Sequence, residues 1–325
     1  ELDSMAQDVR SPSGVPTPDY RAVDALNTHN NRIANKRQEG VLTNLSHARL
    51  GSFASSIGVA FDLTEDRVLD RQVALYGRLE KNWALFGVEN RGNSRSSVWS
   101  FLRQFLDDAK LYNKNPKEFN EGDSRPMVAE SRQLAAMKSV LSGKTPWVLL
   151  VNRADDIKNL IQLKKDYGLN VVILGGAEAW KVAKEIKDAN IPVIMAPSVQ
   201  TPMSFNSVYA RFDQAAYLHN EGVELIITDG SDFGAARTRQ EAGFAVKYGL
   251  SREAALKAIT ETPGKVFGLN RGTIEKGAEA NLVMWNGDPL EPTSWATNIW
   301  IGVKAQSLMN RDRALGDKHL KNLIE

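Results

Sequence analysis

The second half of the chain alternates short, continuous apolar runs with stretches of helical periodicity. The apolar runs are the segments 146–151, 170–174, 191–195 and 223–228. They recur at intervals of roughly 20 to 30 residues, the size of one strand–helix step. A strand that is apolar without alternation is buried on both faces, which is typical of a parallel sheet covered by helices. The pattern predicts an α/β fold, either a closed barrel or an open doubly wound sheet. The expected helices are 155–167, 177–189, 209–220, 236–248, 252–260 and 263–267.

The first half of the chain is less regular. We expect strands at 41–45 and 56–63. From 65 to 112 the periodicity is helical, because apolar residues between Val68 and Tyr76 fall at spacings that share one helix face. The polar segment 113–125 predicts a surface loop. Further helices are expected at 31–38 and 131–141.

Composition excludes several classes of protein. With 325 residues and 42% hydrophobic content, the chain can bury a large core. Its 41 basic and 39 acidic residues give a net charge of +2, which offers no electrostatic case for binding nucleic acid or an anionic membrane. The chain has no cysteine, so zinc–thiolate sites and cysteine nucleophiles are excluded. No apolar run approaches the roughly 20 residues of a membrane helix. We expect a soluble protein, cytoplasmic or periplasmic.

Residues 272–285 read Gly-Thr-Ile-Glu-Lys-Gly-Ala-Glu-Ala-Asn-Leu-Val-Met-Trp. The order predicts a glycine turn, a short strand, a second glycine turn and a strand that ends at Trp285. This G-x-I-x-x-G-x-x-A-N-L-V pattern resembles the C-terminal signature of the amidohydrolase superfamily, and the closest branch is the imidazolonepropionase-like one, with a bacterial source expected. The resemblance covers residues 21 to 305 approximately. It also rests on the segments 21–27, 40–43, 153–157, 175–180, 241–251 and 255–260.

The resemblance implies a (β/α)8 TIM barrel that returns to a small β-sandwich. We expect residues 1–270 to form the barrel domain, and residues 271–325 to form the C-terminal part of the sandwich and a tail. The family hydrolyses C–N bonds, often of non-peptide or cyclic amides, and uses zinc or another divalent metal. The metal ligands of such barrels lie at the C-terminal ends of the strands.

Most of the family's metal ligands have no counterpart in this chain. The His-x-His pair of the first strand would lie upstream of Arg21, where the chain has no histidine and starts at Glu1, so an N-terminal segment is expected to be absent. The histidine positions of the fifth strand correspond to Leu150 and Asn152, and neither residue is a good ligand. After the sixth strand stand Gly175 and Gly176. We therefore assign no metal ligand, and the cofactor stays undefined.

Asp229 follows the predicted eighth strand and is the candidate catalytic residue, as a metal ligand or as the base that takes a proton from water. The alternative is an Asp-Gly turn at a strand end. Asp232 competes for the same role. Asn152 and Arg153 are candidates for substrate contact, although Arg153 also suits the start of the next helix or an ion pair with Asp155. Gly176 is a further candidate, against the simpler interpretation as a tight turn.

Two functions remain open. The chain is either a hydrolase of a C–N bond, with Asp229 as its base, or a degenerate relative that binds a small molecule or a partner subunit without metal. The four histidines fit no metal motif, although His47 is notable because it follows a predicted strand. A small-molecule substrate or ligand is expected in either case. Trp295 and Trp300 are candidates for an interface between copies of the chain, or for sandwich core.

Overall fold

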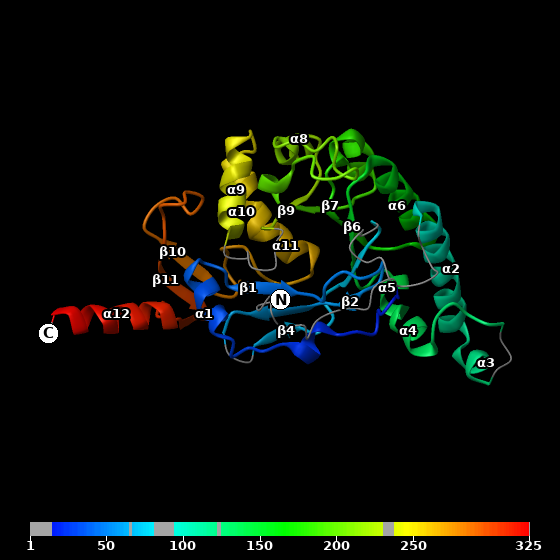
Figure 1. Cartoon of the computed structure of the whole chain (residues 1–325), viewed down its shortest axis with the longest axis horizontal. Helices are drawn as coiled ribbons and strands as arrows, with labels where there is room; N and C mark the ends of the chain where they lie inside the picture. The colour runs from blue at the N-terminus through cyan, green and yellow to red at the C-terminus, as the bar shows by residue number, and fades with distance from the viewer. Residues whose placement is uncertain (1–14, 65–66, 81–93, 122–124, 230–236, 325) are drawn as a thin grey trace.

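The central element is a six-stranded sheet with the order β2-β5-β6-β7-β8-β9 (Figure 1). The computed structural model describes residues 15–64, 67–80, 94–121, 125–229 and 237–324. Strands β5 to β9 run parallel, and β2 lies antiparallel to β5 at one edge. The strands are β2 (Ser56–Ile57), β5 (Leu75–Arg78), β6 (Trp147–Val151), β7 (Val171–Gly175), β8 (Val193–Met195) and β9 (Leu225–Ile227).

Helices form an arc over the outer face of this sheet (Figure 1). The outward side chains of the strands, such as Leu149 and Val151, share one core cluster with residues of α2 and α6. The helices of this layer are α2 (Arg95–Lys114), α3 (Pro116–Asn120), α4 (Ser131–Ala136), α5 (Lys138–Leu141), α6 (Ala154–Tyr167), η3 (Ala179–Val182), α7 (Ala183–Asp188), η4 (Pro197–Val199), α8 (Gln214–Asn220), α9 (Thr238–Lys247), α10 (Arg252–Ile259) and α11 (Glu261–Val266).

The inner face of the sheet is also apolar. Tyr76, Val148 and Val172 are paired across neighbouring strands and belong to a second core cluster, together with Phe267. Because both faces are buried, the strands lack apolar–polar alternation. The predicted α/β architecture with parallel strands is confirmed. Among the described residues the sheet contains six strands, and the prediction was of a (β/α)8 barrel incomplete at its N-terminus.

The helical prediction for residues 65 to 76 is wrong. This segment contains β4 (Val68–Asp70), a turn in which Gln72 N–H donates to Asp70 Oδ1 at 2.7 Å, and β5. Apolar residues in two short strands joined by a turn happen to match helical spacing. Gly77, in β5, leaves no room for a side chain, because an added Cβ atom would lie 1.7 Å from the Phe53 carbonyl oxygen. The helix predicted further on is present as α2.

Two smaller predictions also need correction. The expected loop 113–125 contains the short helix α3, which begins with Pro116 at a position that suits its fixed φ. The short strand expected after Gly272 does not form a ladder among the described residues. The two glycine turns themselves are confirmed, because Gly272 and Gly277 have φ of +94° and +93°.

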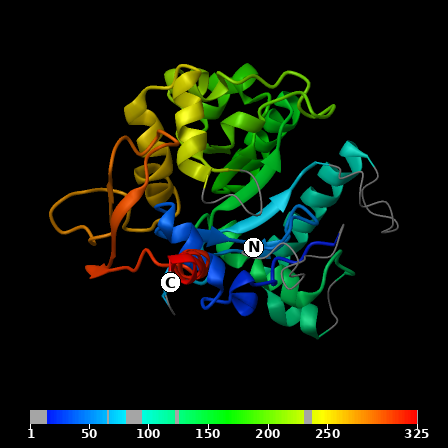
Figure 2. The ribbon, with the colours of Figure 1, turned by 60° about the vertical axis from the view of Figure 1, so that its left-hand side comes forward.

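Two antiparallel sheets accompany the central sheet. The first joins β1 (Thr43–Ser46), β3 (Val59–Asp62) and β4, and the second joins β10 (Leu282–Trp285), β11 (Ala296–Ile301) and β12 (Lys304–Ala305). The predicted end of a strand at Trp285 is confirmed. Helix α12 (Arg311–Ile324) follows the second sheet and extends away from the body (Figures 1 and 2). Just before it, Asn310 bonds to Gln38 of α1 (Asn31–Gln38), near the turn η1 (Ala22–Ala25).

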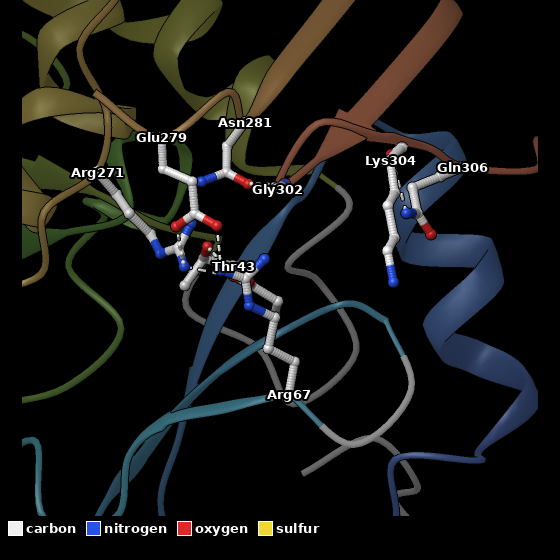
Figure 3. A network of polar contacts seen from close by, with 9 residues as sticks. Thr43, Arg67, Arg271, Glu279, Asn281, Gly302, Lys304 and Gln306 are labelled. Atoms are coloured by element: carbon white, nitrogen blue, oxygen red, sulfur yellow. Dashed lines mark hydrogen bonds and ion pairs between the residues drawn. The ribbon is translucent and has the colours of Figure 1, made fainter. Parts of the chain in front are cut away.

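A buried ion network connects these parts of the chain (Figure 3). Asp62, at the end of β3, is fully buried and lies 3.2 Å from both Arg67 and Arg271. Arg271 also pairs with Glu279 at 2.9 Å, and Arg67 pairs with the same carboxylate. Thr43 Oγ1 donates to Asp62 at 2.8 Å. Residues from β1, β3, β4 and the segment before β10 are therefore held by one set of charges.

Replacing Gly77 with alanine should destabilise the protein. The new Cβ atom meets backbone rather than a flexible side chain, so β5 or the segment at Phe53 must shift, at a cost of about 2–3 kcal/mol in the free energy of unfolding. Urea denaturation measures the change. The control is Gly316→Ala in α12, where a Cβ atom meets nothing, and which should change stability by less than about 1 kcal/mol in either direction. Equal effects of the two substitutions would contradict the packing at β5.

The ion network predicts a pH dependence for Glu279. Its hydrogen bond from Arg67 lowers the pKa of this carboxyl below the ordinary 4.5, so Glu279 contributes stability at neutral pH that is lost as the pH falls through the lowered pKa. Burial raises the pKa of Asp62, which has the opposite effect on the slope. The stability difference between the native chain and Glu279→Gln should therefore be largest near pH 7 and shrink in acid. A difference that is constant with pH in urea titrations would contradict this assignment.

Candidate active site

The C-terminal ends of β5 to β9 meet at one edge of the sheet, because the strands are parallel and in register. Leu150 pairs with Arg78 on one side and Leu174 on the other, and Ile194 pairs with Ile226. Side chains alternate between the two faces of a strand. Leu79 and Val151 lie in the outer core, so Glu80 and Asn152, two residues after Arg78 and Leu150, lie on the inner side. Polar side chains thus replace apolar ones at this edge.

Asp229 lies at the same edge, two residues after β9, and is 4% exposed. Its Oδ2 atom accepts from Arg237 Nε at 2.8 Å. Lys36, from α1, is close enough for the charge of Asp229 to act on it. Burial lowers the pKa of Lys36, and the Asp229 charge opposes that effect. The candidate catalytic carboxylate is therefore a buried strand-end residue with two cations near it, Lys36 from the distant helix α1 and Arg237 from eight residues further along the chain.

Asn152 holds the turn after β7. Its Oδ1 atom accepts from Ala177 N–H at 2.9 Å, and its backbone oxygen accepts from Glu178 N–H at 2.8 Å. Gly176 in this turn is buried with φ of +65°, and its carbonyl accepts from Gln214 at 2.8 Å. Both residues were predicted as substrate contacts, and the structure gives each of them an internal structural contact.

Glu80 is a half-buried carboxyl that the sequence did not indicate. Burial raises the pKa of Glu80, while hydrogen bonds from Asn152 and the charge of Arg78 oppose the shift. Its Oε1 atom is buried and has no hydrogen-bond partner in the described part of the chain. Arg78 lies below it on the inner face and donates from Nε to the Glu80 carbonyl at 3.2 Å. Burial lowers the pKa of Arg78.

The remaining predicted residues lie elsewhere. Arg153 is the residue before α6, and its guanidinium lies 3.6 Å from Asp155, the ion pair that the sequence offered as an alternative. Asp232 lies outside the described residues. His47 stacks on Tyr76 with ring centroids 4.2 Å apart, and its Nδ1 atom lies 2.7 Å from the Ala48 carbonyl oxygen.

Comparisons with known proteins agree with this architecture. Residues 210–307 match the model of the amidohydrolase family. Amidohydrolase tasK of Hapsidospora irregularis is 32% identical over 92 residues, which are 27% of this chain and 9% of that protein. A solved amidohydrolase structure from Thermotoga maritima superimposes with a TM-score of 0.82 at 24% identity, covering 93% of this chain and 80% of the other. Residues 210–307 therefore resemble the amidohydrolase family, and the chain as a whole has the fold of a solved amidohydrolase.

These comparisons identify the fold of the chain more closely than its activity. The similarity to the Thermotoga amidohydrolase extends over nearly the whole chain, so the central sheet and its helices have the amidohydrolase fold, which is a TIM barrel. The chain spans less than a tenth of the length of the curated amidohydrolase it matches. Within the described residues, no helix is long and apolar enough to cross a membrane.

The residues at the strand ends do not fit a divalent metal of the amidohydrolase type. A catalytic zinc site takes about three protein ligands from His, Asp, Glu or Cys. No group of three such residues lies together in the described ranges. Leu150 lies in the apolar layer with Leu174. Gly175 has no side chain, and an added Cβ would meet Asn152 Oδ1 at 2.7 Å.

Sequence reasoning missed three residues at or near the C-terminal edge of the central sheet. Glu80 and Arg78 were assigned to a helix, because the strand β5 was not recognised. A glycine within an apolar run, here Gly77, is a signal for a strand with close backbone approach and could have indicated it. Lys36 belongs to a correctly predicted helix, but its approach to Asp229 is a contact between distant segments that local sequence does not encode.

The contacts of Asn152 predict that it is needed for stability. Asn152→Ala removes the acceptor for the Ala177 N–H group and a partner of Glu80, which should cost about 1–3 kcal/mol in the free energy of unfolding. The control is Asn159→Ala, at an exposed position of α6, which should be close to neutral. Denaturation curves of both variants that overlay the native curve would mean that Asn152 serves a ligand alone.

Proposed function

We propose that the protein is a hydrolase of C–N bonds, acting on a non-peptide or cyclic amide, with Asp229 as the general base. The observation that carries the proposal is the position of this carboxylate, buried at the C-terminal end of a parallel strand. Active sites of barrel enzymes lie at that end of the strands. The match of residues 210–307 to the amidohydrolase family supports the same reaction class in general terms.

The chemistry required of Asp229 is a proton transfer. The carboxylate takes a proton from water while the water oxygen attacks the amide carbonyl carbon. The C–N bond then breaks, and the proton passes from Asp229 to the departing nitrogen. The tetrahedral oxygen develops negative charge, and cations fixed in a partly buried site stabilise such charge. Lys36 and Arg237 are the cations beside Asp229.

A second candidate, binding without hydrolysis, is favoured by one specific observation. Asp229 is already engaged by Arg237 at 2.8 Å, and its charge also acts on Lys36. An ion-paired carboxylate is a weaker proton acceptor than a free one, because the cation stabilises the charged form. Among the described residues, no group of three His, Asp or Glu side chains is placed to hold a hydrolytic metal. In this alternative the protein is a pseudoenzyme that binds a small molecule or a partner subunit.

Other predictions accompany both candidates. The division into a barrel domain, residues 1–270, and a C-terminal sandwich part with its tail, residues 271–325, stays a prediction. So do the roles of Asn152 and Arg153 in substrate contact and the association of the chain with a second copy. Location in the cytoplasm or periplasm is likewise a proposal.

The hydrolase proposal is tested with Asp229→Asn. The purified protein is incubated with a panel of N-acyl amino acids, hydantoins and lactams, and the release of amine or carboxylate is measured. If Asp229 is the general base, the substitution should lower kcat by about 10²- to 10⁴-fold. The matched control is Asp188→Asn, an exposed aspartate at the end of α7, which should leave turnover unchanged.

Three outcomes separate the candidates. Turnover that depends on Asp229 supports the hydrolase. Turnover that Asp229→Asn leaves intact contradicts the role of this residue. Saturable binding of a panel compound in calorimetry, without turnover and unaffected by dialysis against a chelator, supports the binding protein instead.

A further inference from the structure

Arg78 is the charged member of an otherwise apolar layer. The register places it beside Leu150, and the layer continues through Leu174, Ile194 and Ile226. Arg78 is half-buried, and its Nε atom donates to the Glu80 carbonyl. A guanidinium on the inner face, directly below the strand ends, is costly unless a negative group meets it.

A second arginine, Arg49, lies in the segment before β2, which packs along β5. The ring of His47 stacks on Tyr76, which lies two residues before Arg78 on the same face of β5. Further along, the Ser52 carbonyl accepts from Arg78 N–H at 2.8 Å. Arg49 lies between these two contacts and has an exposed side chain. Its charge acts on Arg78, adding to the effect of burial in lowering the pKa of Arg78.

Arg49 and Arg78 differ from the other arginines near this edge of the sheet in their ion pairing among the described residues. Arg271 and Arg237 are each paired with a carboxylate, whereas neither Arg49 nor Arg78 forms an ion pair with any residue that the structure describes. Glu80 is the acidic group whose charge acts on Arg78, and its carboxyl is bonded to Asn152. Two adjacent guanidinium groups repel each other, and an anion between them removes that cost.

We propose that Arg78 and Arg49 form an anion-binding subsite at the C-terminal end of β5, on the sheet edge that also carries Asp229, and that it accepts a carboxylate or phosphate group of a small molecule. Guanidinium groups bind both anions through paired N–H donors. With the proposed hydrolase function, on which this reading of the substrate rests, the subsite selects amides that carry an acidic group. Binding of a free anion requires no hydrolysis, so the two proposals can fail separately.

The test measures binding of two probes, inorganic phosphate and succinate, to the full chain by isothermal titration calorimetry. Arg78→Gln should weaken the better probe by about 10-fold or more, the loss expected for a hydrogen bond to a charged group. Arg78→Lys keeps the charge and should retain part of the affinity, and Arg49→Gln should also weaken binding. The control is Arg103→Gln on α2, an exposed arginine outside the subsite, which should bind as the native chain does.

Circular dichroism melting establishes that each variant is folded. If Arg78→Gln does not fold, the exposed Arg49 provides the decisive variant. The proposal is overturned if neither probe binds saturably, or if the Gln variants and the Arg103 control bind equally well. Preference for succinate over phosphate identifies a carboxylate ligand, and the reverse identifies a phosphate ligand. Loss of turnover on the amide panel with intact anion binding leaves the subsite standing and removes the hydrolase function alone.

Discussion

The structure depends on the hydrogen-bonded register of five parallel strands. The ladder from β5 to β9 sends every second side chain outward into the helical layer and the others to the inner face. A shift of one residue in any strand would exchange the two sets, which the large outer core forbids. The same register brings Glu80, Asn152 and Asp229 from distant parts of the chain to one edge of the sheet, where Glu80 contacts Asn152.

Local sequence was sufficient to predict an element where its residue pattern is compatible with only one type of secondary structure. The apolar runs 146–151, 170–174, 191–195 and 223–228 became strands within one or two residues of their expected limits, because no other arrangement buries them on both faces. The segment 65–76 failed for the opposite reason, since its apolar residues satisfy both helical and strand spacing. Because of that error, Arg78 and Glu80 were not predicted to lie at the edge of the sheet. Asp229 and Asn152 follow correctly predicted strands and were predicted there.

The C-terminal segment supports the candidate site through α1. Gln38 donates to the Leu308 carbonyl, Asn310 bonds to Gln38, and the same helix carries Lys36 toward Asp229. Arg271, from the segment before β10, pairs with both Asp62 and Glu279. Removing one partner from a buried ion network costs several kcal/mol, because the other charge is left uncompensated. The signature of glycines and acidic residues after Gly272 thus fixes the position of the elements beneath the site.

Positive charge is the property that the edge of this sheet offers to a ligand. A divalent metal in a hydrolase polarises the carbonyl and supplies charge for the developing oxyanion. The described residues hold no matching set of ligands. Lys36 and Arg237 instead lie near Asp229, and Arg78, whose pKa the Arg49 charge affects, lies at the end of β5. Fixed cations cannot activate water as a metal does, yet they can hold an anionic group and orient it toward a carboxylate. A molecule that joins an acidic group to an amide would use both pairs of cations at once.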